Sequence, residues 1–180
     1  MSLIYEPAED SYLLESLISK YAKGKSVIDI GTGSGILAKK ALSSGAKSVI
    51  AIDINSESIK QLKKEKIKAI KSDLFSKVKG KFDLIICNPP YLPEDKQEDK
   101  ESQIITSGGK KGDEFILKFL NQAVNHLNKN GIILLLVSSL TPVKRILKLL
   151  NRLNFKHKLI ASKKIFFETL YVWEIKYFLN

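Results

Sequence analysis

Short apolar runs alternate along this chain with segments in which apolar side chains recur at helical spacing. The apolar runs predict strands at 26–30, 48–53, 67–71, 82–87, 131–139, 155–162 and 169–178. Helical spacing predicts helices at 9–22, 34–44, 56–65, 113–128 and 142–153. Residues 92–111 show no periodicity and are expected to form a long loop, a feature that is often functional in a domain of this size.

This order of elements predicts an α/β fold. Strands that alternate with helices favour a doubly wound, mostly parallel sheet, here of seven strands, with helices on both faces. The last two strands follow each other without a helix and are expected to form an antiparallel pair at the end of the sheet. Residues 1–180 contain no linker or repeat, so a single domain is expected. In such sheets ligands bind beyond the carboxyl ends of the strands.

Composition narrows the class of protein. Hydrophobic residues make up 44% of the 180 residues and charged residues 27%, as in a folded globular domain. Cys87 is the only cysteine and the two histidines are far apart, so neither a disulfide framework nor a metal site is expected. The N-terminal residues lack the features of a signal peptide, and no apolar run is long enough to cross a bilayer. These features favour a cytoplasmic protein.

The formal net charge of +11 has two explanations that the sequence leaves open. A lysine-rich solvated surface is one of them. Attraction for an anionic partner, such as RNA, a ribonucleoprotein or an acidic protein, is the other.

A glycine-rich turn follows the first predicted strand. In VIDIGTGSGILA, Gly31, Gly33 and Gly35 stand between a strand and a helix, where glycines let the backbone turn sharply and a ligand approach closely. The spacing is not the G-x-G-x-x-G of a dinucleotide site. Asp29, just before the turn, is unfavourable beside a pyrophosphate but suits an ammonium group.

Acidic residues also follow the next two strands. Asp53 ends the second strand, where a carboxylate can accept hydrogen bonds from ribose hydroxyls. Asp73 follows the third strand and is suited to an adenine amine, with Leu74 packing on the ring. Each acid alone is equally typical of a helix cap or a solvated turn. Together with Asp29 they indicate a ligand with an ammonium group, a ribose and an adenine but no phosphate, which describes S-adenosylmethionine.

The fourth predicted strand, FDLIIC, runs directly into Asn88, Pro89, Pro90 and Tyr91. Two prolines end the strand at once, because they fix φ and cannot donate to a ladder. An ordinary turn would account for this. The alternative is a rigid turn that holds an amide and a phenol in a fixed pose, and the neighbouring acids favour that alternative.

The combined motifs resemble the HemK family of S-adenosylmethionine-dependent methyltransferases, in its small archaeal and eukaryotic branch. The resemblance rests on D-x-G-x-G-x-G, the two strand-end acids, N-P-P-Y, YEPAEDSYLL near the N-terminus, GGKKGDEFILKFL (108–120) and ETLYVWEI (168–175). It implies a Rossmann-like class I fold and methylation of the glutamine side chain in the Gly-Gly-Gln loop of class-I translation release factors. Relatives often carry Glu where this chain has Asp29.

The resemblance also implies roles for individual residues. The predicted cofactor-binding residues are Ser11, Asp29, Gly31, Gly33, Gly35, Asp53, Asp73 and Leu74. The predicted catalytic residues, which would hold the substrate amide, are Asn88, Pro89, Pro90 and Tyr91. Glu6, Pro7 and Glu9 are expected to help close the site.

Two further expectations concern partners. Relatives are commonly activated by a small zinc-binding protein beside the third strand, and Ile67 to Lys71 would be an accessible sheet edge for it, unless the lysines there only protect the edge. The alternative substrate is an exocyclic adenine or guanine amine of nucleic acid. A 180-residue chain leaves little room for the base-reading segment which that substrate requires.

Overall fold

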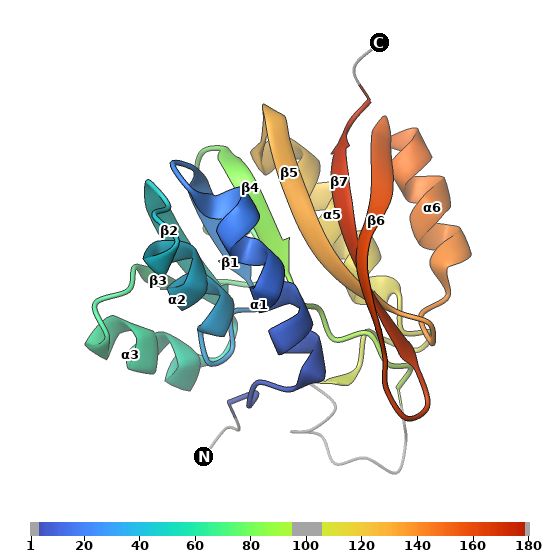
Figure 1. Ribbon diagram of the computed structural model, residues 1–180, viewed down its shortest axis with the longest axis horizontal. Coiled ribbons are helices and arrows are strands. Elements are labelled where there is room, and N and C mark those ends of the chain that lie inside the picture. The colour runs from blue at the N-terminus through green and yellow to red at the C-terminus, as the bar shows by residue number, and fades with distance from the viewer. Residues whose placement is uncertain (1–3, 95–105, 179–180) are drawn as a thin grey trace.

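A seven-stranded sheet forms the centre of the computed structural model, which describes residues 4–94 and 106–178 (Figure 1). The strand order is β3-β2-β1-β4-β5-β7-β6. The first five strands pair in parallel and the last two antiparallel. The strands are β1 (Ser26–Ile30), β2 (Ser48–Asp53), β3 (Ala69–Lys71), β4 (Phe82–Cys87), β5 (Leu127–Ser138), β6 (Phe155–Lys164) and β7 (Thr169–Tyr177).

Helices cover both faces of the sheet (Figure 1). Neighbouring β4 residues point to opposite faces, because side chains alternate along a strand. Leu84 and Ile86 join the apolar cluster that contains helix residues from α1, α2 and α3. Ile85 and Cys87 join the cluster that contains residues of α5 and α6. The helices are α1 (Glu9–Ala22), α2 (Ile36–Ser43), α3 (Ser56–Lys64), α5 (Glu114–His126) and α6 (Val143–Arg152).

The predicted class, strand number, mixed sheet and antiparallel end pair are confirmed, but several element boundaries differ from the prediction by one to four residues, and two of these differences have a clear structural cause. The third strand begins at Ala69 rather than at Ile67, because Lys66 adopts a positive φ of 62° and the Ile67 amide donates to the Leu62 carbonyl at the end of α3. Ile67 therefore belongs to the turn after the helix, and the Lys68 carbonyl is the first group to bond to β2, through the Ala51 amide. As predicted, β3 lies at an edge of the sheet.

The second correction concerns the start of β5. The strand begins at Leu127 and not at residue 131, so the preceding helix ends at His126. Leu127 is opposite Phe82 in the sheet, and the Asn128 side-chain amide donates to Asp83 Oδ1 at 2.7 Å. Residues 128–130 are all polar, so apolar and polar positions do not alternate there. For this reason the sequence pattern did not reveal the first part of the strand.

Chain order reverses between β1 and β4, which are neighbours in the sheet. This is the switch point at which a doubly wound sheet leaves a crevice at the carboxyl ends of its strands. Of the predicted loop 92–111, residues 95–105 lie outside the described residues, and Leu92 and Ser107 on either side of them form a parallel bridge. Among the described helices none is long and apolar enough to cross a membrane.

Candidate active site

A cavity of about 980 Å³ opens at this crevice. Its walls come from the ends of β1, β2, β3 and β4 and from the segment around Tyr5. The structure brings most of the predicted site residues together here: the lining includes Gly31, Gly33, Asp53, Asp73, Leu74, Asn88, Pro89, Pro90 and Tyr91. Ser11, Asp29 and Gly35 are not among the lining residues.

Asp53 is held in a fixed orientation at the cavity wall. Its Oδ2 accepts from the Gly33 amide and its Oδ1 from the Asn55 amide, both at 2.8 Å. The Gly31 amide donates to the Ile52 carbonyl at 2.9 Å and thereby fixes the glycine turn beside this carboxylate. A carboxylate has about four acceptor positions, so one further bond per oxygen remains for a ligand.

Asp29 lies behind the glycine turn and is fully buried. Thr32 Oγ1 donates to its Oδ2 at 2.6 Å, whereas Oδ1 has no hydrogen-bond partner among the described residues. Burial raises the pKa of Asp29 to about 7, the Thr32 bond and the Ala38 backbone amide oppose this rise, and the charge of Asp53 adds to it. A buried carboxylate with an unused oxygen is costly for the fold, and such groups concentrate at functional sites.

A glycine is required at position 35 for a steric reason that does not involve a ligand. It adopts a φ of 81°, and a Cβ built there would lie 2.3 Å from Leu62 Cδ2. The glycine therefore allows the turn to pack against α3. Its role at the cofactor stays a prediction beside this support of the turn.

Asp73 and Leu74 follow β3. The Asp73 side chain is 54% exposed and pairs with Lys118 at 2.6 Å. Such an exposed pair contributes about 0–1 kcal/mol, so a ligand can compete for the carboxylate. Leu74 is buried and has a φ of 47°, unusual for a residue with a branched side chain.

Asn88 stands at the end of β4 with its amide oriented by α1. Its Nδ2 donates to Ser11 Oγ at 3.4 Å, while the buried Oδ1 has no hydrogen-bond partner among the described residues. Ser11 therefore contacts a predicted catalytic residue, although the motif suggested a cofactor contact. Burial, followed by the charge of Asp10, raises the pKa of the half-buried Tyr91 phenol, which keeps it neutral.

A second glycine-rich segment, residues 108–112, supports the N-P-P-Y turn from behind. A Cβ built on Gly112 would lie 2.8 Å from the Tyr91 carbonyl oxygen, at a φ of 85°. The Gly108 amide donates to the Leu92 carbonyl at 2.9 Å. Asp113 follows this segment directly, and its buried carboxylate accepts a hydrogen bond from Arg145 at 2.8 Å. The backbone of the predicted catalytic turn is thus fixed by packing and hydrogen bonds.

Comparison with known proteins places this arrangement in a family. Residues 9–167 match the model of the methyltransferase small domain. The chain belongs to the methyltransferase small-domain family.

Two curated relatives show where in this family the chain lies. It is 40% identical over 178 residues to "Putative protein N5-glutamine methyltransferase MJ0928" of Methanocaldococcus jannaschii, covering 94% of this chain and 89% of that protein. It is 35% identical over 136 residues to the release factor glutamine methyltransferase of Borreliella burgdorferi, covering 67% of this chain but only 48% of the relative. The chain therefore spans nearly all of the first relative and about half of the second. The expected HemK-type methyltransferase is confirmed.

Solved structures agree with this placement. The E. cuniculi Mtq2-Trm112 complex, responsible for the methylation of the eRF1 translation termination factor, matches with a TM-score of 0.78 at 26% identity, over 96% of this chain and 98% of that one. A ribosomal protein L11 methylase from Lactobacillus delbrueckii matches with a TM-score of 0.70 at 27% identity, over 96% and 81% of the two chains.

The structure also adds residues to this methyltransferase site that the sequence pattern did not single out. Tyr5 and Asp10 line the cavity, and the Tyr5 hydroxyl donates to the two carboxylate oxygens of Asp10 at 2.7 and 2.8 Å. A Cβ built on Gly33 would lie 3.5 Å from Tyr5 Cβ, so Tyr5 covers the glycine turn. The position of both residues inside YEPAEDSYLL is the only signal that the sequence offered.

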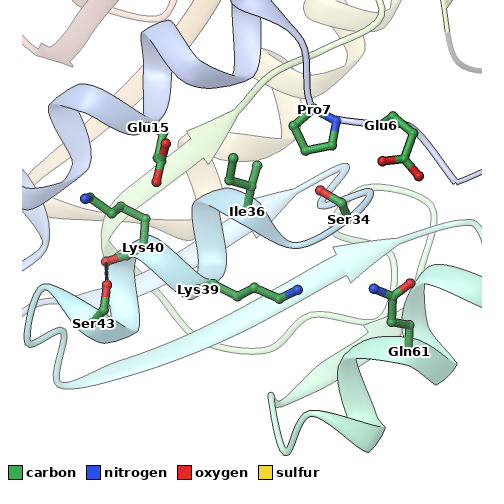
Figure 2. Close-up of a pocket in the computed structure, with 9 residues that line it drawn as sticks. All are labelled: Glu6, Pro7, Glu15, Ser34, Ile36, Lys39, Lys40, Ser43 and Gln61. Carbon is green, nitrogen blue, oxygen red and sulfur yellow. Dashed lines mark hydrogen bonds between the residues drawn. The ribbon is translucent and has the colours of Figure 1, made fainter.

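The three residues expected to help close the site are not among those that line the cavity. Glu6 and Pro7 line a neighbouring depression of about 600 Å³ together with α2 residues such as Lys39 (Figure 2). Glu9 forms an ion pair with Lys163 of β6. Tyr5 and Asp10, on either side of these three residues, line the main cavity.

Proposed function

We propose that this methyltransferase uses S-adenosylmethionine to methylate the side-chain nitrogen of the glutamine in the Gly-Gly-Gln segment of a class-I translation release factor. The observation that carries the proposal is the Asn88 side chain. Its Oδ1 is a buried acceptor without a partner among the described residues, and the residue lines the cavity. A primary amide presents the two N–H donors that such an acceptor and a neighbouring carbonyl can receive.

The donor set of the cavity fits this cofactor. Asp53 offers acceptors for ribose hydroxyls at the cavity wall, and the carboxylate of Asp29, buried behind the glycine turn with an unpaired Oδ1, favours a positively charged group near that turn. Two carboxylates at the glycine turn would repel a pyrophosphate. The residues that would hold the cofactor are Asp29, Gly31, Gly33, Asp53, Asp73 and Leu74, with Gly35 and Ser11 as supports. When bound, the cofactor supplies a methyl group activated by its positively charged sulfur.

The chain's own residues prepare the substrate nitrogen. Asn88 Oδ1 and the Pro89 carbonyl accept hydrogen bonds from the two N–H groups of the substrate amide, which raises the electron density on a nitrogen whose lone pair is otherwise delocalised. Ser11 fixes the Asn88 amide through Nδ2, so that Oδ1 rather than Nδ2 remains available. The neutral Tyr91 ring packs against the planar amide. Such alignment contributes roughly 7–11 kcal/mol in favourable cases.

Proton balance requires no strong base in the site. The substrate nitrogen gains one methyl group and loses one of its two protons. The amide oxygen of Asn88 accepts the hydrogen bond of the departing proton, which passes to water. The raised pKa of Tyr91 is consistent with a phenol that positions the substrate and does not itself exchange a proton.

A methyl-transfer assay with two classes of acceptor tests the proposal. The chain is incubated with methyl-labelled cofactor and with a folded release factor, or with RNA or DNA. We expect label in the release factor only, and none when its Gly-Gly-Gln glutamine is replaced by asparagine, whose amide is one methylene shorter. Label in nucleic acid alone would overturn the proposal.

The nucleic-acid alternative rests on the N-P-P-Y motif, which indicates the reaction class but not the substrate, and on the net charge of +11. Such a charge attracts any anionic partner and carries no sequence specificity. The assay above therefore decides between the two substrate classes, because the transferred methyl group marks the acceptor itself.

We further propose that a small zinc-binding activator docks at the β3 edge. The Mtq2 neighbour was solved as a complex with Trm112, which supports a second subunit here. The Lys68 carbonyl and the Ser72 amide bond to β2, so the polar groups of Ala69 point away from it.

Copurification tests this docking. Replacing Ala69 with proline removes an outward N–H at a sheet edge, where proline is tolerated. We expect the Ala69→Pro variant to lose its partner while it still binds the cofactor. Retention of the partner would contradict docking through this edge.

A further inference from the structure

Two adjacent phenylalanines form the tip of the β6–β7 hairpin and are almost completely exposed. Phe166 is 98% and Phe167 94% accessible to solvent, whereas the other large exposed apolar side chains of the described residues are about half covered. The loop between the strands is closed by the Ile165 amide, which donates to the Glu168 carbonyl at 2.9 Å. The two ring centroids lie 6.5 Å apart, with 39° between the ring planes.

The hairpin does not need aromatic residues at these positions. Tight hairpin turns favour Asn, Asp and Gly, which adopt positive φ values easily. Neither phenylalanine has a positive φ, and their exposed rings contribute almost no burial to the fold. Where a local preference is violated without a gain in packing, a functional reason is expected.

Directly after its turn, the hairpin is joined to the loop between β5 and α6. The Ser139 amide donates to the Thr169 carbonyl at 2.8 Å, and the Thr169 amide donates to Ser139 Oγ at 2.9 Å. Two residues further along this loop, Thr141 Oγ1 donates to the Tyr91 carbonyl at 3.4 Å. Leu140, between them, is 48% exposed. A chain of direct contacts thus connects the hairpin to the N-P-P-Y turn.

The hairpin tip also lies at the end of the sheet where the cavity opens. Figure 1 shows the β6–β7 turn at the same end of the molecule as the segment that precedes α1. Lys163 near the tip forms an ion pair with Glu9 at the start of α1. The orientation of the tip is therefore fixed from two sides, by the β5–α6 loop and by α1.

We infer that Phe166 and Phe167 dock the apolar surface of the folded protein substrate that surrounds the methylated glutamine. This inference rests on the proposed function. A glutamine side chain is short, so the protein that presents it must lie against the rim of the cavity while the amide reaches Asn88. Exposed aromatic residues next to such a site are typical anchors of protein–protein interfaces.

The chemistry of the tip favours a protein over nucleic acid. Residues 165–168 contain no cation and one acid, Glu168, whereas proteins that bind single-stranded nucleic acid combine aromatic rings with a positively charged groove. Of the two lysines that precede this loop, Lys163 is already engaged by Glu9, which leaves Lys164 as a single cation beside the loop rather than a charged groove. The tilted rings also do not form one flat surface on which bases could stack.

Steady-state kinetics on the folded release factor test this inference. The variant Phe166→Ser/Phe167→Ser is compared with the unmodified chain and with Phe178→Ser, which removes an exposed phenylalanine at the opposite end of β7. We expect the double substitution to raise KM for the folded factor roughly ten- to hundredfold, with kcat and the cofactor Kd unchanged. The control should leave KM unchanged.

Several results would overturn the inference. One is an unchanged KM in the double variant; another is a fall in kcat at constant KM, which would indicate distortion of the site. Loss of RNA or lipid-vesicle binding in the double variant, with normal kinetics on the factor, would assign the tip to another partner. If the unmodified chain does not methylate the factor at all, the proposed function itself fails, and this inference fails with it.

Discussion

Replacing Asp29 with asparagine should stabilise the ligand-free protein at neutral and higher pH. The carboxylate is fully buried, and burial raises its pKa from 3.8 to about 7. Asparagine has nearly the same shape and keeps an oxygen that can accept the hydrogen bond from Thr32, but it carries no charge at any pH. The substitution therefore removes the cost of burying a charge while it changes the packing little.

The size of the effect follows from the pKa difference. The folded protein retains a proton on Asp29 between pH 3.8 and about 7, while the unfolded chain loses it. Each pKa unit corresponds to about 1.36 kcal/mol, so up to about 4 kcal/mol of folding stability is lost as pH rises through this window. Below pH 3.8 Asp29 is protonated in both the folded and the unfolded chain, and none of this folding stability is lost. Above about pH 7 the loss is complete.

Urea unfolding at pH 4 and pH 8 measures this difference. We expect the free energy of unfolding of the Asp29→Asn variant, relative to the unmodified chain, to rise by about 2–4 kcal/mol between pH 4 and pH 8. The same variant should bind S-adenosylmethionine roughly ten- to hundredfold more weakly, because a charge-assisted hydrogen bond is lost. Stability and function would then change in opposite directions at a single residue.

Asp83→Asn is a matched control for which the expected change in folding stability at pH 8 has the opposite sign. The amide and hydroxyl of Ser26 both donate to Asp83 Oδ2, and these bonds, against a smaller effect of burial, lower the pKa of Asp83. Its stabilisation is present at pH 8 and lost as pH falls through its low folded-state pKa, so Asp83→Asn should destabilise the protein at pH 8. If Asp29→Asn is no more stable than the unmodified chain at pH 8, the carboxylate of Asp29 is not desolvated and the reasoning is refuted.

Three further predictions concern packing and burial. Gly35→Ala should lower the free energy of unfolding by about 3 kcal/mol, because it adds strain at φ 81° and a clash with Leu62; the same loss in a Leu62→Ala background would contradict this cause. Arg145→Met should lower the free energy of unfolding by about 2 kcal/mol at pH 8 and by less at pH 5. Burial already raises the pKa of Asp113 and loss of the guanidinium raises it further, so at the lower pH the unpaired carboxyl group is protonated more readily. Equal losses at both pH values in urea unfolding would refute the ion-pair explanation. Cys87 is fully buried with a raised pKa, so iodoacetamide should modify it only in denaturant, as mass spectrometry would show.

Much of the fold was predictable because buried parallel strands must be apolar over their whole length. The run FDLIIC indicates such a strand without any tertiary information. The start of β5 was not predictable in this way, because residues 128–130 are polar and lie at the register shift between the pairs Phe82–Leu127 and Leu84–Ile132, so that only Leu127 in this stretch pairs with β4. Pairing partners are set by the folded chain, and a local pattern cannot report them.

The predicted site residues gather for a similar reason. Asp53 ends β2, Asp73 lies two residues after β3 and Asn88 directly follows β4, and the carboxyl ends of parallel strands meet at one edge of a sheet. Contacts between distant segments were beyond the sequence pattern. Ser11 lies 77 residues before Asn88, and only the packing of α1 against the sheet brings their side chains together. The same packing places Tyr5 over the glycine turn.

The most direct test of the central claim is to locate the transferred methyl group and to measure how its transfer depends on Asn88. A folded release factor is incubated with S-adenosylmethionine and either the unmodified chain or its Asn88→Ala variant, and the product is analysed by fragmentation mass spectrometry. We predict one methyl group on the side-chain nitrogen of the Gly-Gly-Gln glutamine, formed about a hundred- to a thousandfold more slowly by the variant although the cofactor still binds. A methyl group on any other atom, or an Asn88→Ala variant as fast as the unmodified chain, would contradict the account.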